Sequence, residues 1–291
     1  MLMPLFQAEA LWINFRSLSG YPFALKIAAG KINAVSAEAW RAGLHRRPAQ
    51  DYVVIPGQPW LDGFAVRRGV IRQFVAMPLG AGYSVEEQLT GAADIGGIQL
   101  QAHPLRADVY FQETVAPRLP KTLADVLALL IPEPAVKFDS ATACCAMAAP
   151  PCPAASAAPG MGLGAGGQMR QEIYADRRPL SDWDAALRRR CFVHLCNSLL
   201  WREITGAAPP QPPVTANEYT RAGLPWFDYY REDFRPLPGG KAFAKVRSIF
   251  QLGKKKGDVP LPSNEPIQTP HVVPVGPTKR RAGEVRAWRG D

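Results

Sequence analysis

Short segments in which apolar and polar residues alternate recur along the first 117 residues. In residues 11–16, Leu, Ile and Phe alternate with Trp, Asn and Arg, and residues 97–102 repeat the pattern with Ile98 and Leu100 on one side. A period of two is typical of a strand with one buried face. The predicted strands comprise residues 11–16, 23–27, 32–35, 52–55, 64–66, 70–77 and 97–102.

Two pairs of these strands are close enough in sequence to form hairpins. Residues 23–27 and 32–35 are separated by a short segment containing Gly30, which can take the positive φ that a tight turn requires. The strand at 70–77 follows 64–66 after a turn ending in Gly69, and it is apolar on both faces. We therefore place it centrally in the sheet.

The pattern predicts a β-rich α+β protein, with residues ~1–117 forming an antiparallel sandwich or a partly open barrel. A few packed helices and a disordered C-terminal tail complete the predicted fold. Residues 121–131 are expected to form one helix, because their leucines and Val126 recur at helical spacing before Pro132. A second helix is predicted from a cap at Ser181 to about Thr205.

Composition changes along the chain and divides it into four predicted parts. The segment 141–167 is uncharged and consists mostly of Ala, Gly and Pro, which favours a flexible linker. The aromatic run 224–230 is expected to pack on the core. The parts are a β-rich core with a short helix (1–132), an Ala/Pro/Gly-rich linker or insertion (133–167), a helical and aromatic segment packed on the core (168–252) and a basic disordered tail (253–291).

The net charge of +9 on 291 residues is concentrated near the C-terminus. Residues 241–291 carry +7, which leaves +2 for residues 1–240 and argues against a broad nucleic-acid-binding face there. The basic tail is expected to make only weak, nonspecific contacts with polyanions. Any other protein or ligand partner is not specified by the sequence.

The location predicted for the chain is the cytoplasm, with no membrane association. The cysteine count is five, an odd number, and three of them lie in the predicted linker, which favours reduced thiols. The first residues do not have the pattern of a signal peptide, and no apolar run approaches the roughly 18 residues of a membrane-spanning helix.

Two segments resemble known binding motifs, but the sequence around each of them does not suit the corresponding site. Cys191, His194 and Cys196 resemble part of a metal site, but on the predicted helix Cys196 would face away from His194. Residues 162–167 match the glycine pattern of dinucleotide-binding loops, yet they follow a linker instead of a hydrophobic strand. We therefore expect neither a metal nor a cofactor.

The best candidate for a ligand site is the segment 58–63, which places Trp60 and Asp62 between turn-forming residues. An aromatic ring beside a carboxylate suits stacking and hydrogen bonding of a polar ligand such as a sugar. In the alternative interpretation, Trp60 closes one end of the β-domain and Asp62 with Gly63 forms a turn.

The sequence therefore predicts a cytoplasmic, non-catalytic binding or structural β-module of unspecified ligand. The alternative is a carboxylate-dependent hydrolase, acting for example on a carbohydrate, in which Asp62 works with Asp51, Glu86 or Glu87. Two carboxyl groups facing each other across a cleft would favour the enzyme. Carboxylates dispersed over separate turns would favour the module.

Overall fold

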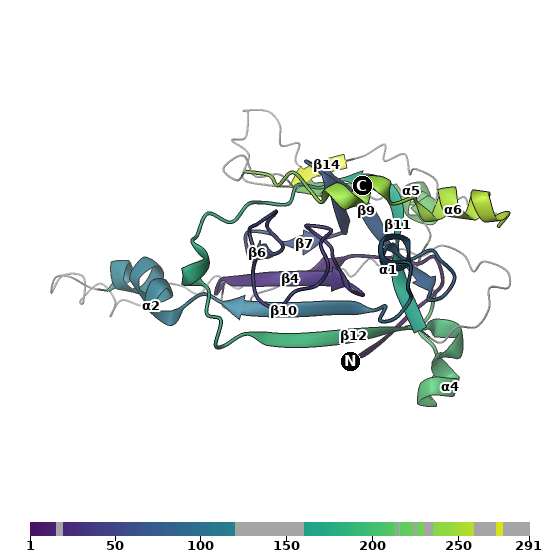
Figure 1. Ribbon diagram of the computed structural model, residues 1–291, viewed down its shortest axis with the longest axis horizontal. Helices are drawn as coiled ribbons and strands as arrows, with labels where there is room; N and C mark the ends of the chain where they lie inside the picture. The colour runs from purple at the N-terminus through teal and green to yellow at the C-terminus, as the bar shows by residue number, and fades with distance from the viewer. Residues whose placement is uncertain are drawn as a thin grey trace, which may run out of the picture.

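The computed structural model describes residues 1–15, 20–119, 160–212, 214, 216–223, 226–229, 235–258 and 272–275. Ten strands form one sheet, in the order β2-β9-β11-β12-β10-β4-β5, with β8 added to β9, β1 to β12 and β6 to β4. In Figure 1, β4, β10 and β12 run side by side, and β9 and β11 cross them at a steep angle. The sheet therefore has two parts, one with β4, β10 and β12 and one with β9 and β11. They diverge because β11 pairs with β12 only at Gly160 and Met161.

The described part of the chain contains the following elements. The strands are β1 (Leu2–Leu5), β2 (Ala10–Leu11), β3 (Ile13–Asn14), β4 (Phe23–Ala29), β5 (Ile32–Asn33), β6 (Val53–Ile55), β7 (Trp60–Leu61), β8 (Gly63–Arg67), β9 (Val70–Pro78), β10 (Ile98–Pro104), β11 (Gly160–Arg170), β12 (Arg189–Asn197), β13 (Trp226–Tyr229) and β14 (Val272–Val275). The α-helices are α1 (Val85–Thr90), α2 (Ala107–Tyr110), α4 (Trp201–Thr205), α5 (Ala216–Arg221) and α6 (Ile249–Lys256). Single helical turns occupy Phe111–Val115, Ala116–Arg118, Leu180–Asp182, Ser198–Leu200 and Lys241–Lys245.

The predicted β-rich α+β class is confirmed. Both hairpins are present: β4 pairs with β5 around Gly30, whose φ is +56°, and β9 pairs with β8. A side chain at Gly30 would collide with the carboxylate of Glu86. The strand β9 lies inside the sheet as expected, between β2 and β11. Among the described residues the path ends at β2 and β5, so the sheet does not close into a barrel.

The main hydrophobic core fills the space between the two parts of the sheet. It contains side chains from both parts, such as Ile27 of β4 and Leu163 of β11. Phe64 and Phe74 meet edge to face with ring centroids 4.7 Å apart, and Phe243 packs against Phe64. This burial of large apolar side chains is the main source of the fold's stability.

The predicted boundary of the linker at residue 167 is wrong, because residues 160–167 belong to the internal strand β11. Met161, Leu163 and Ala165 are buried in the core, and the glycines that alternate with them lie on the other face. That face allows close packing: a Cβ on Gly164 would lie 2.7 Å from Ile249 of α6. The alternation indicates a strand, but the Ala/Gly/Pro composition obscured it.

The helix predicted from Ser181 to Thr205 is also wrong for most of its length. Residues 189–197 form β12, which pairs with β10 on one side and with β1 on the other. Val193 and Leu195 point into the core, whereas the rings of Phe192 and His194 contact each other at a tilted angle on the opposite face. Pairing with strands from distant parts of the chain overrides the local capping signals. Helical structure resumes only at residue 198.

The basic tail begins later than predicted, because residues 253–256 form the last turn of α6, which is capped by Gly257. Residues 272–275 form β14, which pairs in parallel with β13. The predicted helix at 121–131, most of the linker and most of the tail lie outside the described residues. Polyanion binding by the tail therefore stays a prediction.

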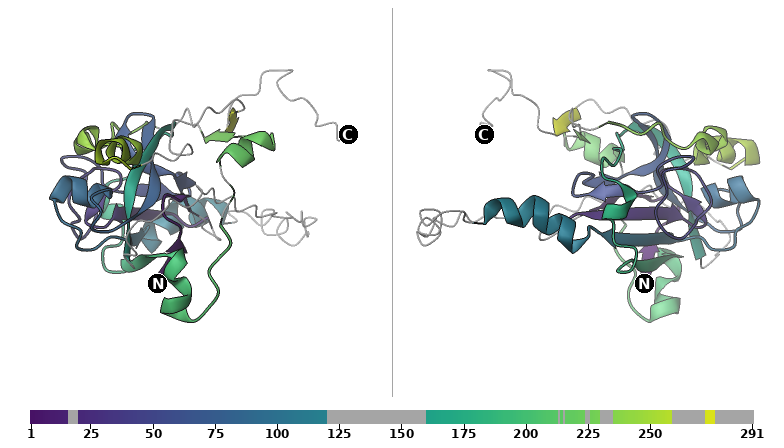
Figure 2. Two further views of the ribbon diagram at one scale, coloured as in Figure 1. Left: turned by 90° about the vertical axis from the view of Figure 1, so that its right-hand side faces the viewer. Right: turned by 60° about the vertical axis from the view of Figure 1, so that its left-hand side comes forward.

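The helices α2 and α4 project from the sheet in different directions, whereas α6 packs on β11. The right-hand view of Figure 2 shows α2 and the turns after it extending away from the strands. In Figure 1, α4 extends below β12, on the side opposite α6.

In the described part of the chain, no helix has the length and apolar character required to cross a membrane.

The close approach of α6 to β11 predicts that Gly164→Ala destabilises the protein. The new methyl group would lie 2.7 Å from Ile249 and 3.0 Å from the carbonyl oxygen of Tyr83. Overpacking of this kind costs about 1–3 kcal/mol. Gly167→Ala is the matched control, since no atom lies within 4 Å of its Cβ position. Urea denaturation should show the loss for Gly164→Ala only, and equal effects of the two variants would contradict the packing described.

Candidate functional site

Trp60 and Asp62, the residues singled out from the sequence, contact each other directly. Asp62 is the single residue between β7 and β8, and its Oδ2 accepts a hydrogen bond from Trp60 Nε1 at 2.9 Å. Gln171 adds a second donor, since its Nε2 lies 3.0 Å from the same oxygen. The Asp62 backbone N–H donates to Gln171 Oε1 at 3.0 Å. The carboxyl group is therefore fixed from two sides.

A second indole extends this arrangement to the surface. Trp12, which lies between β2 and β3, meets Trp60 edge to face with ring centroids 6.3 Å apart. The pairing of β3 with β7 brings the two segments together. Trp12 is 39% exposed, and Trp60 is partly exposed. We call Trp12, Trp60, Asp62 and Gln171 the indole–carboxylate site.

The surroundings of Asp62 disfavour its ionised form. Burial raises the pKa of the carboxyl group to about 6, although the Trp60 N–H partly offsets this effect by stabilising the anion. Within the described residues, Oδ1 has no hydrogen-bond partner, and it is not sealed from solvent. The group can therefore accept a hydrogen bond through Oδ1 when ionised and carry a proton when neutral.

The other carboxylates considered from the sequence do not join Asp62 through any contact between described residues. Asp51 pairs with the Lys26 ammonium at 2.6 Å. Glu86 accepts backbone N–H groups from two neighbouring turns at 3.0 and 2.8 Å. Glu87 completes the capping box at the start of α1. Each of these three carboxylates thus has a structural partner of its own.

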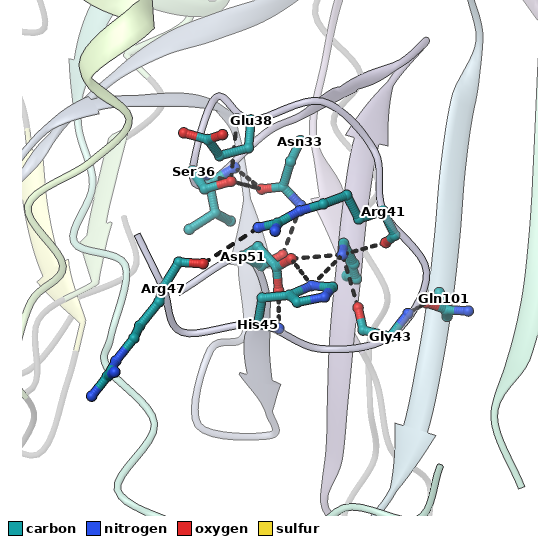
Figure 3. Close-up of polar contacts among 11 residues, drawn as sticks. Asn33, Ser36, Glu38, Arg41, Gly43, His45, Arg47, Asp51 and Gln101 are labelled. Carbon is teal, nitrogen blue, oxygen red and sulfur yellow. Dashed lines mark hydrogen bonds and ion pairs between the residues drawn. The ribbon is translucent and has the colours of Figure 1, made fainter. Parts of the chain in front are cut away.

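Figure 3 shows the polar cluster around Asp51, which the sequence did not reveal. The Lys26 Nζ donates to the carbonyl oxygens of Arg41 at 2.6 Å and Gly43 at 2.8 Å, in addition to its ion pair with Asp51. His45 Nδ1 lies 2.9 Å from Asp51 Oδ2. Burial lowers the pKa of Lys26, whereas the hydrogen bond with Asp51 opposes this shift. The cluster fastens the loop that contains residues 41–51 over the face of β4 opposite the core.

An extended segment, residues 171–176, connects the indole–carboxylate site with the rest of the molecule. Gln58 Nε2 donates to the Glu172 carbonyl at 3.1 Å, and its Oε1 accepts the Tyr174 N–H at 3.2 Å. Gln50 repeats the arrangement, donating to the Tyr174 carbonyl at 3.3 Å and accepting the Asp176 N–H at 2.8 Å. We call residues 171–176 the glutamine-bridged segment.

The sequence did not predict Trp12, Gln171 or the two bridging glutamines as parts of the site. Trp12 carries a sequence signal, because it occupies the polar face of an alternating segment, where an exposed indole is unusual. Gln171 carries none, since its contact with Asp62 spans 109 positions along the chain. Gln58 lies within the segment that was singled out, but its amide serves the backbone instead of a ligand.

The remaining motif-like strings have structural settings of their own. Cys191 is exposed and Cys196 is buried, both on β12, and the glycines of 162–167 lie in β11. No group of three or more His, Cys, Asp or Glu side chains suited to a metal ion occurs among the residues that the structure describes.

Comparison of this chain with protein-family models, with curated proteins and with solved structures gives no match. The function therefore has to be inferred from the geometry of the molecule itself.

The raised pKa of Asp62 predicts how Asp62→Asn changes the pH dependence of stability. Between pH 4 and 6 the folded protein holds a proton that the unfolded chain releases, so this group makes the folded state less stable as pH rises. Relative to Asp62→Asn, the wild type should lose about 2 kcal/mol of unfolding free energy between pH 4 and pH 7.5.

Chemical denaturation at a series of pH values measures this difference. Asp108→Asn is the control, because the hydrogen bond from Arg106 holds the pKa of the exposed Asp108 carboxyl below its usual value. That variant should not show a dependence of the same sign. A difference between wild type and Asp62→Asn that stays constant with pH would contradict the environment described for Asp62.

Proposed function

We propose that the protein is a non-catalytic cytoplasmic binding module that holds a neutral polyhydroxylated ligand, such as a saccharide, at the indole–carboxylate site. One observation carries the proposal: Trp60 and Gln171 hold Oδ2 of Asp62, whose Oδ1 has no hydrogen-bond partner among the described residues, and the exposed Trp12 meets Trp60 beside it. The proposal uses the residues singled out from the sequence and adds Trp12 and Gln171 to them.

The chemistry of the four side chains suits such a ligand. Indole rings offer large apolar faces that pack against the C–H groups of a sugar ring. A carboxylate oxygen accepts hydrogen bonds from hydroxyl groups. Because Trp60 and Gln171 already hold Oδ2, the ligand does not have to immobilise the carboxyl group, and binding costs less conformational entropy.

A second candidate function is the carboxylate-dependent hydrolase. The observation that favours it is the pKa of Asp62 near 6, which is suitable for a general acid. A glycoside hydrolase also needs a second carboxyl group at about 5–10 Å. Asp51, Glu86 and Glu87 are each engaged in other contacts, so the binding module is the preferred function.

The experiment is a saccharide screen on the full chain, followed by calorimetric titration of the best ligand. Asp62→Asn preserves the shape of the side chain but removes its charge, so affinity should fall about 10- to 100-fold. Trp12→Ala should weaken binding by a similar factor, because it removes one of the two indoles. Trp201→Ala on α4 is the matched control and should bind like wild type.

Each outcome has a definite meaning. Saccharide binding that is retained in Asp62→Asn and in Trp12→Ala, or absent from the wild type, would contradict the proposed site. Release of reducing sugar by the wild type but not by Asp62→Asn would replace the binding module with the hydrolase. Binding without turnover, lost in the two site variants alone, would support the module.

A further inference from the structure

A cavity of about 290 Å³ lies between the loop at residues 46–50 and residues 237–239. Its walls are mostly apolar and come from Val35, Pro48, Ala49, Leu237 and Pro238. Gly239 also lines the cavity, together with three polar side chains, those of Arg46, Gln50 and Asp176. A concave, mainly apolar space with a few fixed polar groups is the usual form of a small-molecule site.

The negative charge at the cavity is already satisfied by the protein. Asp176 Oδ2 accepts hydrogen bonds from Arg46 Nη2 at 2.8 Å, from the Tyr52 hydroxyl at 2.7 Å and from Trp183 Nε1 at 2.8 Å. Its Oδ1 accepts the backbone N–H of Arg178 at 2.9 Å. Four donors leave this buried carboxylate little capacity for a cationic or hydrogen-donating ligand.

Gln50 is committed in the same way. Its Nε2 donates to two backbone carbonyl groups, those of Tyr52 at 2.8 Å and Tyr174 at 3.3 Å, and its Oε1 accepts the Asp176 N–H at 2.8 Å. The amide therefore has both of its N–H groups occupied by the protein. A ligand in the cavity cannot gain a strong contact from Gln50 without breaking one that supports the glutamine-bridged segment.

Arg46 differs, because two of its five N–H groups are unused. Its Nε donates to the Tyr52 hydroxyl at 2.9 Å, and Nη2 donates to Asp176 and to the Arg178 carbonyl oxygen. Within the described residues Nη1 has no hydrogen-bond partner. The guanidinium group is thus held in place by three bonds, and its remaining donors can serve a ligand.

The protonation states of Tyr52 and Arg46 are consistent with Arg46 acting as a hydrogen-bond donor to a ligand. Burial raises the pKa of the Tyr52 hydroxyl, so it stays neutral and keeps donating to Asp176. Burial alone would lower the pKa of Arg46, but the hydrogen bonds and charges of Tyr52 and Asp176 outweigh that effect and raise it. Arg46 therefore remains a cation, with about a third of its side chain exposed.

We propose that this cavity binds a small carboxylic acid with an apolar body, whose carboxylate accepts a hydrogen bond from Arg46 Nη1. The unused side-chain donors select an anionic acceptor, and the apolar walls select the body attached to it. A carboxylate fits better than a phosphate, because a phosphate presents more charge and more oxygen atoms than one Nη1 group can satisfy. None of the lining residues belongs to the indole–carboxylate site, so the two proposals stand separately.

The test uses the full chain with hexanoate and benzoate as probes, titrated calorimetrically and followed by ligand-observed NMR. Hexanamide is the neutral probe of matched shape, and inorganic phosphate is the anion without an apolar body. Both carboxylates should bind to the wild type at least about 10-fold more tightly than hexanamide or phosphate, because only they match both the cation and the apolar walls.

Three variants locate the binding. Arg46→Met should weaken carboxylate binding about 10- to 100-fold. Arg47→Met, at the exposed neighbouring position, should leave it unchanged. Ala49→Leu fills the cavity without touching the hydrogen bonds of Arg46, so it should also reduce binding and keeps the test valid if Arg46→Met fails to fold.

The proposal is overturned if neither carboxylate binds at millimolar concentration, or if Ala49→Leu binds as well as the wild type. It is also overturned if phosphate binds more tightly than both carboxylates. Loss of hexanoate and benzoate binding in Arg46→Met and Ala49→Leu, with Arg47→Met unaffected, supports it. Saccharide binding at the indole–carboxylate site is measured separately and has no bearing on these outcomes.

Discussion

The backbone of residues 172–176 needs hydrogen-bond partners on both edges. The positions of both candidate sites depend on how the protein supplies these partners. On one edge, the Ala175 N–H donates to the Arg235 carbonyl, and the Ile173 carbonyl accepts from Leu237, each at 2.7 Å. On the other edge, no strand of the described part of the chain is paired with this segment, and the amides of Gln50 and Gln58 act in its place. A primary amide has one acceptor and two donors, so it can bridge backbone groups as a neighbouring strand would.

Both candidate sites lie at the ends of this glutamine-bridged segment. Gln171, at its start, holds the Asp62 carboxyl group beside Trp60. Asp176, at its end, holds Arg46 at the cavity, together with Tyr52 and Trp183. Both carboxyl groups are directed by bonds whose distances lie between 2.7 and 3.0 Å. The glutamine-bridged segment therefore positions the Asp62 carboxyl group at one end and the Arg46 guanidinium group at the other.

The sequence predicted those features of the structure that depend on interactions between residues close together in the chain. The hairpin at Gly30 and the contact of Trp60 with Asp62 involve residues close in sequence, and both were accessible from the sequence. Contacts between distant residues were not, since Arg46 and Asp176 are 130 positions apart and nothing near either residue indicates the other. The strands β11 and β12 were not predicted for a related reason. The glycine content of β11 suggested a linker, and capping residues before β12 suggested a helix. Both strands are stabilised by pairing with distant strands.

Each bridging glutamine protects a specific backbone amide, and hydrogen exchange followed by NMR measures this protection most directly. In Gln58→Leu, the Tyr174 N–H should exchange faster, and in Gln50→Leu the Asp176 N–H should do so, because each loses its acceptor. The Ala175 N–H, which donates to the Arg235 carbonyl, should keep its protection in both variants. Unchanged exchange at Tyr174 and Asp176, or equal acceleration of all three amides, would contradict the account.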